Sequence, residues 1–427
     1  MRAAHSRTPR PWISLAGAAA LLAASVAPAT AQPRPPESVR FATFNASLNR
    51  SLAGRALYDL SHPLAPLTAN SDLQAGNVAE IIQRVRPAVL LINEFDFEPD
   101  DALAEAFQDF YLSDPQNGAE PIDYPFVFSA PSNTGIASGF DLDNSGGVGG
   151  PNDAFGFGFF PGQFGMGVFS QYPILYDQVR TFQLFLWKDM PGALLPDIAA
   201  TPAPADWYSP AELDVFRLSS KSHWDVPINI DGTVVHFLVS HPTPPVFDGP
   251  EDRNGTRNHD EIRFWADYIT PGPTSAYIYD DEGSFGGLAP GALFVIAGDQ
   301  NSDPLDGDSI PGSSQQLIEH PLINTKVTPS SPGAVEQNGL QGGANLTHQS
   351  NPAFDTADFA DTAPGNLRAD YVLPSRSLRF TDAAVFWPLA SDPLFPLVGV
   401  FNFALISVGG FPSSDHRMVW IDVRVPG

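Results

Sequence analysis

Two polar residues follow an apolar run near position 294, and their spacing suits chemistry on a phosphate group. Phe294 to Ala297 is apolar, Gly298 ends the run, and Asp299 and Asn301 follow two residues apart. Residues i and i+2 of an extended segment point to the same side, so the carboxylate and the carboxamide would converge at the strand end. Such a pair suits a hard divalent cation or a phosphate under attack. The alternative for this motif alone is an Asx turn that closes a strand.

Further polar residues stand where other strands are expected to end. They are Asn45, Glu94, His241, Asp370 and the adjacent pair Asp415 and His416. In a layered α/β fold, the loops at one edge of a sheet build the site. Each residue alone also fits a structural role, such as a cap or a satisfied histidine, but the whole set on one chain indicates a functional site.

Hydrophobic periodicity predicts the elements that must position these residues. Val78, Ile81, Ile82 and Val85 have helical spacing, and Asn258 with Glu261 three residues later is typical of a capping box at a helix start. A hairpin is predicted around the turn at Asp231 and Gly232. The predicted strands cover residues 39–45, 88–93, 165–171, 224–230, 235–239, 293–297, 368–374 and 418–425, and the predicted helices cover 74–85 and 314–319.

In their order and local sequence, these motifs resemble those of the endonuclease/exonuclease/phosphatase superfamily. The matches are Gly298 to Asn301, Ser414 to His416, Arg368 to Tyr371 and Ile92 to Glu94, over a skeleton of residues 39–425. The resemblance implies an α/β fold, a four-layer α/β sandwich of two packed, mostly antiparallel β-sheets flanked by helices. The long loops 114–162 and 302–365 are insertions in that fold.

The resemblance also implies a metal-dependent hydrolase that acts on phosphate ester bonds. Glu94 would be the main metal-binding carboxylate, with Asn45 and Asp415 near it. The expected cofactor is a divalent cation, with Mg²⁺ first and Mn²⁺ or Ca²⁺ as alternatives, because carboxylates and amides hold such hard ions. The cation would neutralise the phosphate and lower the pKa of bound water.

The remaining motif residues would carry catalysis. Asp299 would orient or deprotonate the attacking water, and Asn301 would hold the phosphate or a second metal. His241 and His416 would bracket the phosphate, and Asp370 would orient a histidine, with His241 as the expected partner. The candidate substrate contacts are Lys221, His223, Arg253 and Arg257; for both arginines a solvated surface position is the alternative.

The N-terminal residues predict export. Three arginines precede an apolar run from Ile13 to about Val26, and Ala29 to Ala31 is a small-x-small cleavage site, which is typical of a secretory signal peptide. We therefore expect a signal peptide over 1–31, a linker over 32–38 and one domain over 39–427, in a protein that is secreted or periplasmic. Cleavage after Ala31 moves the formal charge from −26 to −29, because the removed segment holds three arginines and no acid.

The charge and the composition of the chain limit the classes of substrate and ligand that it is expected to bind. There are 48 acids against 22 Lys and Arg and no cysteine, so a broad basic groove for nucleic acid and thiolate metal sites are disfavoured. We expect a monomer that acts on a small phosphoester without stable membrane insertion. An extracellular nuclease, a lipid phosphodiesterase whose Phe-rich segment 155–164 touches a membrane, and a non-catalytic binding module are the alternatives. The segment 141–152 resembles half of a calcium loop, with a solvated turn as the other interpretation.

Overall fold

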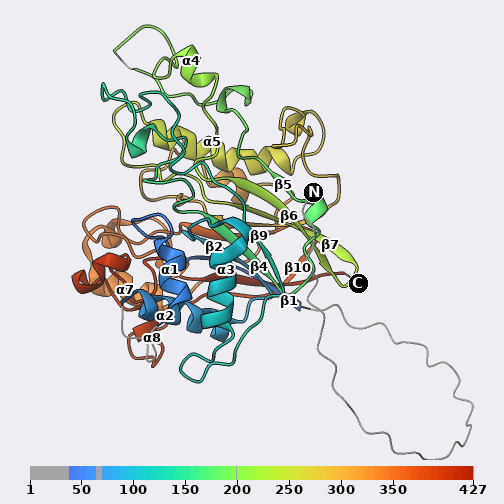
Figure 1. The fold of residues 1–427 in the computed structure, drawn as a ribbon, viewed down its shortest axis with the longest axis vertical. Helices are drawn as coiled ribbons and strands as arrows, with labels where there is room; N and C mark the ends of the chain where they lie inside the picture. Colours follow the sequence, from blue (N-terminus) through green and yellow to red (C-terminus); the bar gives the residue numbers. More distant parts are fainter. Residues whose placement is uncertain (1–37, 64–69, 199, 427) are drawn as a thin grey trace, which may run out of the picture. The chain divides into compact units, whose positions relative to one another are not determined.

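The computed structural model of the protein describes residues 38–63, 70–198 and 200–426. The predicted signal peptide and most of the predicted linker lie outside the described residues. Ser38, which was assigned to the linker, begins the first strand. Two β-sheets form the framework of the described part of the chain (Figure 1).

The first sheet has six strands in the order β10-β11-β1-β2-β4-β3. Their bounds are β1 (Ser38–Asn45), β2 (Val89–Asn93), β3 (Phe126–Phe128), β4 (Met166–Ser170), β10 (Arg379–Val385) and β11 (Val419–Arg424). Strands β1 and β2 run parallel, and the other described neighbours in this sheet are antiparallel. Among the described residues, the last strand, β11, therefore lies beside the first strand, β1.

The second sheet has five strands in the order β5-β6-β7-β8-β9. Their bounds are β5 (Arg180–Thr181), β6 (His223–Ile230), β7 (Thr233–Ser240), β8 (Leu293–Asp299) and β9 (Asp370–Pro374). Strands β7 and β8 run parallel, and the other pairs are antiparallel. The predicted hairpin between β6 and β7 is confirmed, since its turn residues Asp231 and Gly232 both have positive φ, 50° and 97°.

Alternating side chains of the second sheet belong to two different cores. Phe237 of β7 faces the first sheet, where its ring centroid lies 5.7 Å from that of Phe41. Its neighbour Leu238 packs instead with helix α5 (Arg253–Tyr268). Helix α2 (Asn70–Val85) covers the first sheet (Figure 1). The layers are therefore α2, first sheet, second sheet and α5, which confirms the predicted four-layer sandwich.

Shorter helices complete the layers and the insertions. They are α1 (Arg55–Ser61), α3 (Ala102–Phe107), α4 (Pro210–Leu213), α6 (Gln315–Ile318), α7 (Pro332–Gln341) and α8 (Phe395–Val398). Helix α7 lies inside the segment 302–365, which the sequence analysis treated as a loop with one short helix. None of the helices in the described ranges is both long and apolar enough to cross a membrane.

The predicted capping box at Asn258 is wrong, because α5 begins at Arg253 and Asn258 lies inside it. The Asn258 amide is fully buried and donates to the carbonyl oxygens of Thr243 and Gln300. Glu261 accepts backbone N–H groups of Ser220 and Thr243. Both side chains therefore tie the helix to loops that follow strands, and neither caps its start.

Candidate active site

The predicted catalytic and metal-binding residues converge because they stand at one edge of the two packed sheets. Asn45 ends β1 beside Asn93 at the end of β2, and Glu94 follows directly. Asp299 ends β8 opposite Asp370, the first residue of β9. Strands β1 and β8 contact each other across the interface between the sheets. The edge of one sheet therefore meets the edge of the other, as the sequence predicted.

The carboxylate of Asp299 is the centre of the cluster. Its Oδ2 accepts a hydrogen bond from Asn45 Nδ2 at 3.0 Å. The same oxygen lies 3.3 Å from His241 Nε2 and 3.6 Å from His416 Nε2. Oδ1 accepts the backbone N–H of Asn301 at 2.9 Å. One buried carboxylate thus contacts residues from both sheets.

Asp370 orients His416, and the predicted pairing with His241 is wrong. The Oδ2 of Asp370 lies 2.8 Å from His416 Nδ1, and it also accepts the hydroxyl of Thr356 at 2.8 Å. The backbone N–H of Asp370 also donates to that hydroxyl oxygen at 3.0 Å. No sequence pattern pointed to Thr356, which lies in an irregular segment 14 residues before its partner.

The three groups predicted to hold a metal also lie close together. Asn45 Nδ2 donates to Glu94 Oε1 at 3.1 Å. Glu94 and Asp415 are half-buried and line one cavity of about 300 Å³. Asp415 accepts from the hydroxyl of Ser47 at 3.3 Å. Neither acid forms an ion pair with a basic side chain in the described part of the chain.

Two site residues hold unusual backbone conformations. Glu94 has φ of 55° and Asn301 has φ of 50°, in the left-handed region that few residues other than glycine adopt. Asparagine tolerates this region, but glutamate rarely visits it, and such a residue persists only where its surroundings over-determine it. The turn after β2 is therefore held in place by its neighbours, and it points the Glu94 carboxylate toward Asn45.

Burial and neighbouring charges set different protonation states for the two histidines. Burial, assisted by Lys221, lowers the pKa of His241 to about 4. Burial opposes the charge on His416 too, but the carboxylates of Asp370 and Asp299 outweigh it and hold its pKa well above the usual value. His416 is therefore an imidazolium at neutral pH, while His241 is neutral.

Asp299 remains ionised between these histidines. Burial disfavours its charge, but His416, His241 and the amide of Asn45 outweigh burial and hold the pKa of this carboxyl well below its usual range. Glu94 behaves in the opposite way, since burial and the neighbouring Asp415 raise its pKa to about 7. A cation between Glu94 and Asp415 would remove that repulsion.

Of the four predicted substrate contacts, the structure places Lys221 beside the cluster. Its buried Nζ donates to the carbonyl oxygen of Pro242 at 3.4 Å, next to His241. Asn301 Nδ2 donates to the same carbonyl at 3.1 Å. Glu261, which was predicted as a capping residue, holds both segments in position through its bonds to Ser220 and Thr243.

The other three predicted contacts are engaged elsewhere in the fold, which corrects their assignment to the substrate. The ring of His223 is fully buried between Ser219 and the carbonyl of Glu261. The guanidinium of Arg257 donates to the carbonyls of Leu218 and Phe155, and Arg253 pairs with Glu251. Their donors satisfy buried backbone or a nearby acid, a role that local sequence does not distinguish from substrate binding.

Arg50 is a site residue that the sequence analysis missed. It lines the same cavity as Glu94 and Asp415, and its Nε lies 3.2 Å from Asp59. Its buried Nη2 has no hydrogen-bond partner among the described residues. In the sequence, the feature that could have indicated Arg50 is weak: it is a basic residue shortly after the predicted strand that ends at Asn45. Arg50 therefore adds a guanidinium group to the wall of the cavity.

The predicted calcium-like segment forms a closed turn. Asp141 accepts backbone N–H groups of Ser145 and Gly146, and Asp143 accepts the side chain of Asn152. Asp153 is buried and accepts three backbone N–H groups. Asp141, Asp143 and Asp153 also place carboxylate oxygens within 4.8 Å of one another, a spacing that could hold a cation, so both interpretations of this segment stay predictions.

Comparison with known proteins identifies the family. Residues 42–416 match the model of the Endonuclease/Exonuclease/phosphatase family, so the chain belongs to that family. Its members are hydrolases that act on phosphate ester bonds, and they generally depend on a divalent metal. No curated protein matches the chain.

Solved structures resemble the chain only distantly. A family protein from Leptotrichia buccalis is 13% identical with a TM-score of 0.43, and the match covers 91% of this chain and 100% of that one. One from Beutenbergia cavernae is 17% identical with a TM-score of 0.45, over 91% and 72%. Sphingomyelinase C from Streptomyces griseocarneus is 12% identical with a TM-score of 0.41, over 90% and 99%. None of these likenesses bears on substrate or mechanism.

The donor set fits the metal that the family implies. Glu94 and Asp415 supply carboxylate oxygens and Asn45 an amide oxygen, which are the ligands that Mg²⁺, Mn²⁺ and Ca²⁺ prefer. The raised pKa of Glu94 shows that the surrounding protein groups do not neutralise the negative charge of its carboxylate. These residues would hold the cation at the open side of the cluster, in the cavity.

The raised pKa of Glu94 predicts how the metal-free protein responds to pH. A carboxyl group with a higher pKa in the folded state binds more protons when folded, so the free energy of unfolding falls as the pH rises from about 4.5 through about 7. In the presence of chelator, Glu94→Gln should therefore raise the melting temperature at pH 8 and change it little at pH 5. The stabilisation is at most about 3 kcal/mol.

The control is Glu105→Gln, which removes an exposed carboxylate from α3 and should change neither value. Adding Mg²⁺ at pH 8 should reverse the order, because only the wild type gains stability from the bound ion. A wild type that is more stable than Glu94→Gln at pH 8 in chelator would contradict the electrostatic account of this site.

His416 provides a second test, through turnover. His416→Ala should lower kcat on a small phosphodiester by roughly 10²-fold or more, the range for lost acid or electrostatic help. Asp370→Asn should lower kcat less and shift the pKa of His416 downward, measured by NMR titration of the ring. Circular dichroism checks that each variant folds.

His62→Gln serves as the matched control, because His62 is exposed on the surface after α1. Unchanged kcat in a folded His416→Ala variant would leave His416 with a structural role alone.

Proposed function

We propose that this protein is an exported, divalent-metal-dependent phosphoesterase that hydrolyses small phosphomonoesters or phosphodiesters. The observation that carries the proposal is the Asp299 carboxylate, held ionised between His241 and His416 beside the acids Glu94 and Asp415. Export rests on the signal-peptide pattern of residues 1–31, and a mature protein that begins at Gln32 would support it.

Each group has a role that its protonation state supports. A cation held by Glu94, Asp415 and Asn45 would supply charge neutralisation of the phosphate and acidification of water. The ionised Asp299 accepts a hydrogen bond from the attacking water and orients it toward phosphorus. The protonated His416 donates to a phosphate oxygen as negative charge builds up in the transition state.

Three further donors can bind the phosphate. The Asn301 amide and the ammonium of Lys221 lie together at the carbonyl of Pro242, next to His241. The guanidinium group of Arg50 lines the cavity together with Glu94 and Asp415. Opposed donors of this kind fix a phosphoryl group so that water attacks in line with the leaving oxygen.

The proposal predicts that activity depends on a divalent ion. Purified protein dialysed against EDTA should lose hydrolysis of bis(p-nitrophenyl) phosphate, and Mg²⁺, Mn²⁺ or Ca²⁺ should restore it. Release of p-nitrophenolate measures the rate. Full activity after exhaustive chelation would overturn the proposal, and the double variant Glu94→Gln/Asp415→Asn is the matched control that no ion should rescue.

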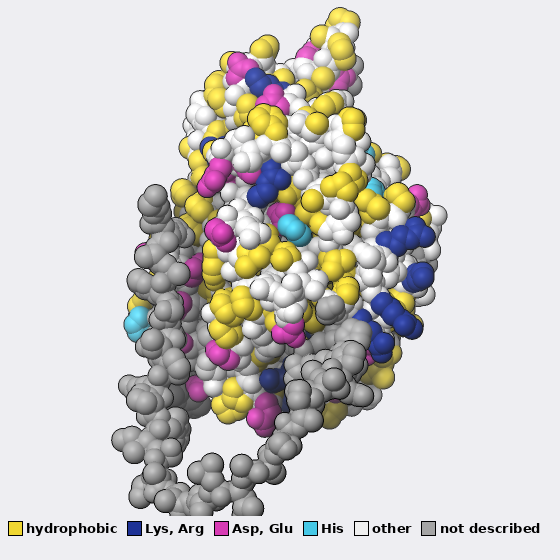
Figure 2. Space-filling view, turned by 90° about the vertical axis from the view of Figure 1, so that its right-hand side faces the viewer, with side chains coloured by type: hydrophobic (Ala, Val, Ile, Leu, Met, Phe, Trp, Pro, Cys, Tyr) yellow, Lys and Arg dark blue, Asp and Glu magenta, His cyan; other side chains and the backbone are white. Residues whose placement is uncertain are grey.

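Charge predicts the substrate class. The mature chain has 19 Lys and Arg against 48 acids, so its far field repels a long polyanion, whose binding normally relies on a basic groove. On the face in Figure 2, several Lys and Arg side chains gather near the right-hand edge, while others are scattered over the rest of the face among the acidic side chains. We expect kcat/KM to be higher for a small phosphodiester than for a defined DNA duplex at physiological salt.

The comparison is made with both substrates at the same ionic strength and metal concentration. A duplex that is the better substrate by an order of magnitude would replace this proposal with the nuclease alternative.

A further inference from the structure

A second cavity is lined by residues next in sequence to those that line the cavity with Glu94 and Asp415. It measures about 250 Å³. Residues 50 and 51 line the acidic cavity and residues 53 and 54 line the second one, while Phe159 and Gln163 line the acidic cavity and Phe160 to Gly162 the second. Because the same two segments bound both spaces, the two cavities lie on either side of one shared rim.

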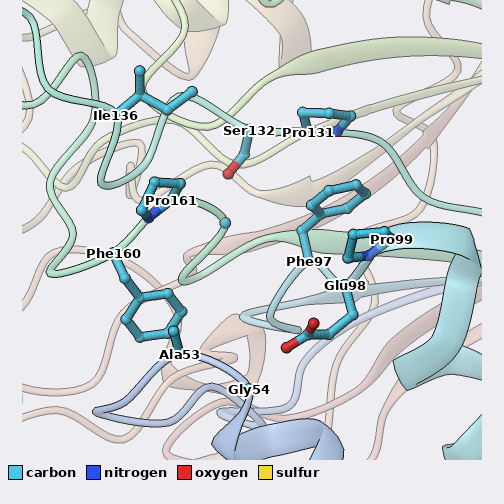
Figure 3. A pocket seen from close by; sticks show the side chains of 11 residues that line it. Ala53, Gly54, Phe97, Glu98, Pro99, Pro131, Ser132, Ile136, Phe160 and Pro161 are labelled. Carbon is cyan, nitrogen blue, oxygen red and sulfur yellow. The ribbon is translucent and has the colours of Figure 1, made fainter.

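The second cavity is apolar. Its lining side chains include Phe97, Ile136, Phe160, Pro131 and Pro161, and Figure 3 shows them around the space. The polar side chains of Glu98 and Ser132 also line it. Glu98 accepts the backbone N–H of Gly54, and the Ser132 hydroxyl is hydrogen-bonded to Thr134. The cavity therefore offers apolar contact and engaged polar groups, which suits a hydrocarbon better than a sugar or a nucleobase.

The rim between the cavities is also apolar and exposed. Leu52 is 67% exposed between the residues that line the two cavities, and Phe159 is likewise 67% exposed on the opposite segment. Ile406, on the third side of the acidic cavity, is 55% exposed. Within the Phe-rich segment 155–164, Phe155 therefore packs in the core, whereas Phe159 lies exposed at the rim. Large apolar side chains left in water around a polar cavity indicate a ligand that is apolar on one side.

We propose that the second cavity is a subsite for an alkyl or aryl group carried by the phosphoester. The substrate is then amphiphilic, with its phosphate beside Glu94 and Asp415 and its hydrocarbon group across the rim among Phe97, Ile136 and Phe160. This inference rests on the proposed phosphoesterase function and narrows its substrate class. A phosphorylated sugar would leave the apolar cavity unused, and its hydroxyl groups would find no free partner there.

A homologous series of substrates tests the subsite. The alkyl p-nitrophenyl phosphates from methyl to hexyl share one phosphodiester and one leaving group, so only the hydrocarbon changes. We expect kcat/KM to rise by roughly tenfold from methyl to butyl, because burial of each methylene is favourable and the cavity is partly open to water. All concentrations stay below those at which the esters aggregate.

Ala53→Trp fills the cavity from its exposed edge with little risk to folding, because Ala53 lies in a surface turn. This variant should lose the preference for butyl over methyl while its kcat/KM on the methyl ester stays within about threefold of wild type. Ala53→Ser controls for the change at that position. Leu340→Trp controls for an added surface indole, because Leu340 is exposed on α7 away from both cavities.

The outcomes separate the two proposals. A flat chain-length profile with metal-dependent hydrolysis of the methyl ester would overturn the subsite and leave the phosphoesterase function intact, whereas no hydrolysis of any ester would count against both. A preference that persists in Ala53→Trp would also overturn the subsite. A final arm adds phosphatidylcholine vesicles to distinguish the source of the chain: a butyl preference seen only with vesicles, and insensitive to Ala53→Trp, would assign recognition to a lipid surface and reject the cavity.

Discussion

The site depends on one buried carboxylate, Asp299, shared by two histidines and an asparagine from three different strand ends. Removing a charge of this kind from water is costly unless its partners are in place, so it stabilises only the packing that brings them together. The two sheets must therefore meet with β1 against β8 in one register. Together with Asp370, the same carboxylate raises the pKa of His416 and keeps it protonated, which links the packing of the core to the chemistry of the site.

Strand-end residues were predictable from sequence because local patterns place them. An apolar run that stops at a glycine or at an acid marks the end of a strand, and Asn45, Glu94 and Asp299 follow such runs. Partnerships across long insertions were not predictable. Asp370 pairs with His416 rather than His241, and His223 and Arg257 bind the fold itself, because only the packed loops decide which donor reaches which acceptor.

Glu261, in the helix layer, is a second residue whose partners could not be predicted from the sequence. In sequence it stands three residues after an asparagine, which is the spacing of a capping box, yet its carboxylate accepts from the segments that carry Lys221 and His241. This buried carboxylate, which lies inside a helix, accepts backbone N–H groups from two loops and so holds them in position. Helical periodicity alone cannot reveal such a role. The fold class could thus be predicted from hydrophobic patterns and from short motifs typical of the family. The contacts that support the site could be identified only from the three-dimensional structure.

The place of β11 has a consequence for how the chain folds during synthesis. This strand is the last in the described part of the chain, and it lies between β10 and the first described strand, β1. Until it leaves the ribosome, β1 has one unpaired edge, and the segment that contributes His416 is missing from the site. Domains of this size fold as units once their non-local strand pairs can form. The nascent protein should therefore stay incompletely folded and inactive until β11 has been made, which leaves it for that time in a state that a chaperone can bind.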